Sequence, residues 1–177
     1  MGWGEFFALA SALCWALAVI LFRRAGDTLP AFELNLFKNL LGFALLVPTL
    51  LIVEGLQMPD YPMKDVAISL LSGYIGIALA DTWYLRALHL MGASRTGIVA
   101  SLLSPFVIVL SFLFLDESFR GLQVAGFALV MGGILLVNWK AHRQSVDTEH
   151  IRKGVLYGIG AVFLMAVGIV MVKEILE

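Results

Sequence analysis

The sequence predicts an all-α membrane protein, and three observations indicate this fold class. Of the 177 residues, 60% are hydrophobic and only 14% are charged, against about a quarter charged in soluble proteins. Six apolar runs are long enough to cross a hydrocarbon core of about 30 Å, which takes about 17–25 helical residues. The segment Gly4 to Asp27 also aligns without a gap with Gly154 to Glu177, and Arg23 and Lys173 take equivalent places near the ends.

The six runs follow one another with mostly short connections. In order, they cover Gly4–Phe22, Ala31–Val53, Val66–Leu90, Ser94–Leu115, Leu122–Trp139 and Val155–Val172. Turn residues such as Gly, Pro and Asp fill the connections, and only residues 140–153 form a longer, charged linker. The first run is not a cleaved signal peptide, because no basic residue precedes it and Arg23 and Arg24 follow it.

The alignment of the first and sixth runs predicts two structural repeats. A first repeat of five helices covers residues 4–139, and residues 154–177 form the first helix of a second repeat. Since five is odd, the sixth helix enters the membrane from the opposite face, which makes the two repeats inverted. The second repeat would stop after its first helix, so we expect the chain to be a fragment of a protein about twice as long.

Two charged side chains fall at a similar depth in the predicted membrane. Lys38 lies about 10 Å and Asp81 about 13 Å from the same face, at 1.5 Å per helical residue. Each charge costs about 2.5–3.5 kcal/mol at such a depth, and pairing would offset part of this cost. Asn39 lies beside Lys38 on the second helix.

The fourth run brings hydroxyl groups to the same level. Ser101 and Ser104 lie about 10–15 Å from that face. Pro105 has no N–H to donate to the carbonyl of Ser101, which leaves that oxygen free. Two hydroxyls and a free carbonyl beside an ion pair could bind a polar solute or an ion. The candidate substrate-binding residues are Lys38, Asn39, Asp81, Ser101, Ser104 and Trp15.

Structural roles remain open for each candidate. Lys38 could extend along its helix to the headgroups, or form a purely structural pair with Asp81. Ser101 and Ser104 could instead bond to their own helix. Trp15 lies in the middle of the first helix, where it either faces lipid or lines a cavity.

Other functional classes lack support in the sequence. The three histidines and the single Cys14 show no metal-ligand spacing, and Cys14 has no partner in the chain for a disulfide. No nucleophile elbow or phosphate-binding loop occurs. With a net charge of −1 and no basic stripe, nucleic-acid binding is not indicated. We expect neither an enzyme nor a bound metal or cofactor.

The stretch Ala80–Asn138 resembles the EamA-type domain of the drug/metabolite transporter superfamily. The resembling elements are Tyr84-Leu85-Arg86-Ala87-Leu88, Gly92-Ala93-Ser94-Arg95, Leu103-Ser104-Pro105, Leu115-Asp116-Glu117 and the glycines from Gly126 to Gly133. The resemblance covers residues 4–139 as one complete domain, with residues 154–177 as the opening of a second.

The resemblance implies a ten-helix carrier with two inverted halves around a central cavity. Such carriers move small metabolites, amino acids, nucleotide sugars or drugs across the plasma (inner) membrane, in some cases with a coupling ion or proton. Ser104-Pro105 matches the fourth-helix motif, Glu117 the acidic position after it, and Lys38 a basic position in the second helix. The stretch Ala12–Ala18 lacks the acid of the related small multidrug exporters, which argues against their type of drug–proton antiport.

Two functions therefore compete at this point. The first is a secondary-active or facilitative carrier that works by alternating access, possible also as a homodimer. The second is a non-transporting helical membrane subunit or assembly factor. The carrier requires a polar cavity, whereas the subunit requires only a closed, dry bundle of helices.

The distribution of basic residues predicts the orientation in the membrane. The face opposite Met1 carries Arg23, Arg24, Arg86, Arg95, Lys140, Arg143, Arg152 and Lys153. Arg86 and Arg95 cluster there with His89, and we expect these three to be solvated. The face of Met1 carries only Lys64 and Arg120. The positive-inside rule then places Met1 outside, although the family resemblance implies cytoplasmic termini. We follow the charge distribution.

A topology reporter fused at Tyr61 tests this orientation. Tyr61 lies between the second and third predicted helices, on the face of Met1. We expect alkaline phosphatase fused at this position to be active, because this enzyme folds only in the oxidising environment outside the cytoplasm. A green fluorescent protein at the same position should stay dark, and the opposite pair of results would reverse the orientation.

Overall fold

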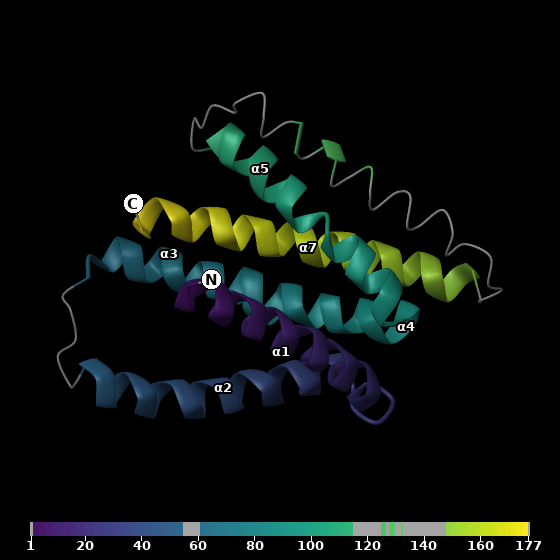
Figure 1. Cartoon of the computed structure of the whole chain (residues 1–177), viewed down its shortest axis with the longest axis horizontal. Coiled ribbons are helices and arrows are strands. Elements are labelled where there is room, and N and C mark those ends of the chain that lie inside the picture. The colour runs from purple at the N-terminus through teal and green to yellow at the C-terminus, as the bar shows by residue number, and fades with distance from the viewer. Residues whose placement is uncertain are drawn as a thin grey trace.

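The computed structural model describes residues 2–54, 61–114 and 148–176, with a few further positions between 125 and 132. Every regular element in these ranges is a helix (Figure 1). The elements are α1 (Trp3–Ala25), α2 (Ala31–Glu54), α3 (Met63–Gly73), η1 (Tyr74–Leu79), α4 (Ala80–Ala100), α5 (Leu103–Phe114) and α7 (Thr148–Leu176). The predicted all-α class is therefore confirmed over the described part of the chain.

Four helical stretches in the described ranges are long and apolar enough to cross a membrane. They are Trp3–Ala25, Ala31–Val53, Met63–Ala100 and Glu149–Lys173, and Leu103–Phe114 is a shorter apolar helix. The predicted run Leu122–Trp139 and the predicted motif residue Glu117 lie largely or wholly outside the described residues. The total of six transmembrane helices therefore stays a prediction.

The third predicted run forms a long helix with a widened turn in its middle. In η1 the backbone adopts the π conformation, and the N–H of Ala80 donates to the carbonyl of Ile75, five residues back. The helix then continues as α4 as far as Gly92, where φ is 79° and ψ is 169°. Glycine alone accepts this backbone conformation at low cost, so the chain turns here.

The prediction of one continuous helix over Ser94–Leu115 is wrong. Helix α4 ends at Ala100, residues 101 and 102 form a turn, and α5 begins at Leu103. The cause is Pro105, which has no N–H and whose ring clashes with a helical carbonyl four residues back. Pro105 is tolerated in the first turn of α5, where no intrahelical donor is needed.

Helix α7 starts earlier than the sequence predicts. It begins at Thr148, inside the predicted linker, and its first turns are supported by an ion pair of 2.8 Å between Lys153 Nζ and Glu149 Oε1. Figure 1 shows that α1 and α7 run in opposite directions. This is the relation that inverted repeats require, while the division into repeats at 139 and 154 stays a prediction.

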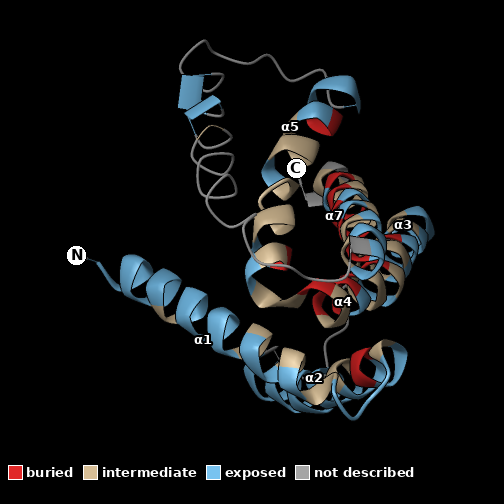
Figure 2. Cartoon of the chain, turned by 90° about the vertical axis from the view of Figure 1, so that its right-hand side faces the viewer, coloured by how far each residue is buried: buried red, intermediate tan, exposed pale blue. Residues whose placement is uncertain are grey.

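The core of the described bundle lies between α4 and α7, which form its most extensive helix contact. Figure 2 shows the buried residues concentrated on these two helices, whereas α1 is almost entirely exposed. On the side of α4 that faces α1 and α2, Leu34, Leu85 and Leu88 form a smaller cluster. On the far side, α5 packs against α7 through Leu110, Ala166 and Val170.

Small residues allow α7 to approach α3 and η1 closely. A Cβ atom added to Gly168 would lie 3.2 Å from the Cα of Gly76 and 3.3 Å from the carbonyl oxygen of Ser72. The hydroxyl of Ser72 donates to the carbonyl of Gly168 at 2.8 Å and is itself buried. Close backbone approach of this kind drives helix association in lipid, where the hydrophobic effect is absent.

Replacing Gly168 by leucine tests this contact. Because the neighbouring atoms belong to the backbone, Gly168→Leu must push the helices apart, and we expect a loss of about 1–3 kcal/mol in unfolding free energy. Gly42→Leu is the matched control, since nothing lies within 4 Å of a Cβ at that position in α2. Unfolding in mixed micelles should show a stable Gly42→Leu protein, and equal stability of the two variants would contradict this account.

Candidate functional site

The structure brings Lys38 and Asp81 together. Lys38 lies on α2 and Asp81 in the first turn of α4, and Lys38 Nζ donates to Asp81 Oδ2. The side chains are 25% and 18% exposed, so the pair is neither fully buried nor fully open. Both residues belong to stretches that can span a membrane. An ion pair at such a position is a typical feature of a functional site, because charges in lipid are costly.

A buried asparagine supports the backbone next to this ion pair. Asn35, 3% exposed, places its Nδ2 atom 3.1 Å from the carbonyl oxygens of both Ile77 and Ala78 in η1. The same nitrogen lies 3.0 Å from Oγ1 of Thr82, and Asn39 Nδ2 donates to Asn35 Oδ1 at 3.0 Å. Asn35 therefore connects α2 to the π segment that leads directly into Asp81.

Asn35 and Thr82 are site residues that were not among the candidates predicted from the sequence. Asn35 precedes Asn39 by one helical turn, so the two side chains share a face of α2 with Lys38, and this spacing was the available signal. Thr82 directly follows Asp81. Its hydroxyl also donates to the carbonyl of Ala78 at 2.6 Å, which adds to the support of η1.

The remaining predicted site residues lie elsewhere. The hydroxyl of Ser101, in the turn after α4, donates to the carbonyl of Gly97 in α4 at 3.1 Å. Ser104 is exposed on α5, which packs against α7 on the other side of α4 from α2 (Figure 2). Trp15 is 58% exposed on α1. The structure thus groups Lys38, Asn39 and Asp81, and the binding roles of all six candidates stay predictions.

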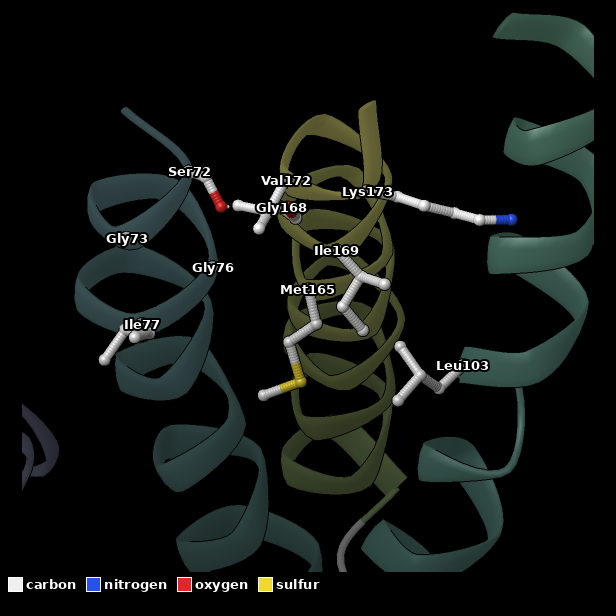
Figure 3. A pocket seen from close by; sticks show the side chains of 10 residues that line it. All are labelled: Ser72, Gly73, Gly76, Ile77, Leu103, Met165, Gly168, Ile169, Val172 and Lys173. Carbon is white, nitrogen blue, oxygen red and sulfur yellow. Dashed lines mark hydrogen bonds between the residues drawn. The ribbon is translucent and has the colours of Figure 1, made fainter. Parts of the chain in front are cut away.

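An apolar groove lies on the opposite side of η1 from the ion pair. It has a volume of about 550 Å³ and is bounded by α3, η1, α7 and the start of α5 (Figure 3). Met165 and Ile169 of α7 and Leu103 of α5 contribute apolar surface to it. Ile77 connects the groove with the surroundings of the ion pair. Its side chain lines the groove, and its carbonyl accepts a hydrogen bond from Asn35.

The described residues contain no cluster of three or more His, Cys, Asp or Glu side chains that could hold a metal ion. The polar chemistry of the site therefore consists of one ammonium group, one carboxylate, two carboxamides and a hydroxyl. These groups can bind a charged or polar solute or exchange a proton.

Replacing Asn35 by leucine tests its support of η1. The variant keeps the branched shape of the side chain but removes the Asn35 donor, which leaves the carbonyl of Ala78 with only the Thr82 hydroxyl as a side-chain donor. We therefore expect a loss of about 1–3 kcal/mol in unfolding free energy. Thr49→Val serves as the control, because the Thr49 hydroxyl bonds only to Leu45 of its own exposed helix, at 2.9 Å. If the leucine variant unfolds at the same midpoint concentration of denaturant as the unchanged protein, Asn35 is not needed to stabilise η1.

Comparisons with known proteins agree with this architecture. The EamA-like transporter family matches residues 2–139. The protein named "Uncharacterized transporter YetK" of Bacillus subtilis (strain 168) is 23% identical over 171 residues, which cover 96% of this chain and 52% of that protein. The chain thus spans about half the length of this curated relative, and no solved structure matches it. Since the family match extends over most of its length, the chain belongs to the EamA-like transporter family of membrane proteins.

Proposed function

We propose that this chain forms one half of a carrier that moves a small metabolite or drug across the plasma (inner) membrane by alternating access. The transport is secondary-active or facilitative, without ATP hydrolysis. Membership of a transporter family and the similarity to a protein named as a transporter support this proposal. The lipid bilayer and a small solute are then its partners.

The pair of Lys38 and Asp81 is the observation that carries the proposal. Apolar residues of similar volume would stabilise a helix contact as well as or better than a buried ion pair does. The cost of about 2.5–3.5 kcal/mol for each charge in a membrane helix is therefore unnecessary for folding alone. A polar solute or a proton that exchanges with the pair gives the two charges a role during transport.

Interruptions of the transmembrane helices also support a carrier. Carriers bind solutes where transmembrane helices are discontinuous, because freed backbone groups can line the path. Here η1 ends two residues before Asp81, and the chain leaves the α-helical conformation again at Gly92 and at residues 101 and 102. These are the places in the described stretch from α3 to α5 at which the backbone departs from regular α-helix.

The other half of the carrier is a second domain of the same kind. It belongs either to a longer polypeptide or to a second copy of this chain in a homodimer. The opposite directions of α1 and α7 support an inverted arrangement of the two halves. A coupling ion or proton would bind at Asp81, which carries the negative charge of the pair.

Substitutions of Lys38 and Asp81 test this function. Cells that express the natural gene are compared with cells that express the substituted gene. Uptake and efflux are measured with labelled amino acids, nucleotide sugars and the dye ethidium. We expect saturable transport of at least one probe, and at least about a tenfold loss in Asp81→Asn with normal membrane insertion. A loss of binding or proton exchange alone leaves the amount of inserted protein unchanged.

The double substitution Lys38→Met with Asp81→Leu separates transport from stability. It removes both charges, so it restores folding if the pair is structural but leaves the carrier inactive if the pair binds solute. Wild-type transport by this variant would remove the pair from the mechanism. Absence of transport for every probe, with a partner protein lost when the gene is deleted, would instead favour a non-transporting subunit.

A further inference from the structure

A second charged residue of α4 has an environment quite different from that of Asp81. Arg86 lies in the membrane-spanning stretch Met63–Ala100, and its guanidinium carbon is 4.8 Å from the centre of the Tyr157 ring on α7. The Arg86 side chain is exposed, and no carboxylate of the described residues pairs with it. Among the described residues, its positive charge therefore contacts an aromatic face and is not paired with a carboxylate.

Packing between α4 and α7 fixes this aromatic face. The ring of Trp83 meets the ring of Tyr157 edge to face, with centres 5.9 Å apart and an angle of 82°. Gly160 leaves the space for Trp83, since a Cβ at that position would lie 2.7 Å from the indole ring. Gly160, Trp83 and Tyr157 thus form a shelf on which Arg86 rests, which we call the aromatic shelf.

Arg86 is exposed beside the Tyr157 ring, so its N–H donors can bind a further group. A guanidinium that lies over a ring interacts through its face, whereas its N–H donors point outward in the plane of the group. This planar fork matches the two oxygens of a carboxylate or phosphate. The desolvation cost of a charge in a membrane segment further favours an anionic partner at this place.

The position of Arg86 along α4 defines which anions can reach it. It lies six residues before the turn at Gly92, or about 9 Å along the helix. A long arginine side chain at this depth reaches the level of the lipid headgroups. Lipid phosphates and solutes that enter from this face of the membrane can both approach the guanidinium.

We propose that Arg86 on the aromatic shelf is a binding site for an oxyanion, either the phosphate of an anionic lipid or the phosphate or carboxylate of a solute. The site lies apart from the Lys38–Asp81 pair, since Arg86 contacts α7 whereas Asp81 pairs with α2. Oxyanion binding at Arg86 does not require that the chain is a carrier. Its failure and the failure of the proposed transport are therefore separate results.

Binding is measured on the full chain in nanodiscs. Trp3, Trp15 and Trp139 are replaced by phenylalanine, so that Trp83 of the shelf is the fluorescent reporter. Inorganic phosphate is titrated in phosphatidylcholine nanodiscs against sodium chloride of equal ionic strength. In a second series, phosphatidylglycerol replaces part of the phosphatidylcholine, and the thermal midpoint is recorded as well.

We expect a saturable response to at least one of the two probes. Phosphate binding in neutral nanodiscs identifies a site for free anions, and a response to phosphatidylglycerol alone identifies a lipid site. Arg86→Gln should weaken the apparent affinity about tenfold or more, as expected for lost hydrogen bonds to a charged group. Tyr157→Leu, which keeps the arginine but removes its support, should weaken binding to a smaller extent.

Arg24→Gln is the matched control, because Arg24 is also exposed but lies on α1, away from the shelf. It should leave both responses unchanged. The proposal is overturned if neither probe gives a saturable response beyond that of sodium chloride. It is equally overturned if Arg86→Gln, folded with a normal thermal midpoint, responds like the unchanged protein.

Discussion

In a hydrocarbon medium each backbone amide or carbonyl needs a partner within the protein, because no water is present to replace it. The stretch from α3 to α5 meets this constraint although it leaves the α-helical pattern three times, in η1, at Gly92 and at residues 101–102. Asn35 and Thr82 donate to carbonyls of η1, and the Thr96 hydroxyl donates to Gly92 at 2.8 Å. The Ser101 hydroxyl likewise donates to Gly97 at 3.1 Å, so each interruption of the helix is accompanied by a nearby side-chain hydrogen bond.

The first two helices could be predicted from the sequence to within a few residues, because long apolar runs between turn residues need no other information. The π conformation of η1 could not, since its carbonyls are supported by Asn35, a residue of another helix. The break before α5 was predictable in principle. Pro105 was identified as a source of a free carbonyl, but its effect on helix continuity was underestimated.

The candidate site also contains residues that could be predicted from the sequence and residues that could not. Similar depth and opposite charge were enough to pair Lys38 with Asp81. Ser101 and Ser104 have a suitable depth too, but depth does not specify which neighbour a helix faces, and α5 faces α7. The contact of Arg86 with the Tyr157 ring could not be predicted either, because Tyr157 belongs to a distant segment of the chain.

The widened turn of η1 has a mechanical consequence for everything that follows it. An α-helix advances about 100° and about 1.5 Å per residue, so a change of η1 from the π to the α conformation would rotate and shift α4 by one such step relative to α3. Asp81 and Arg86 are carried by the same helix and would turn together. A rotation that withdraws the Asp81 carboxylate from Lys38 would also move the Arg86 guanidinium away from the ring of Tyr157. Both side chains would therefore lose their present contacts in the same motion.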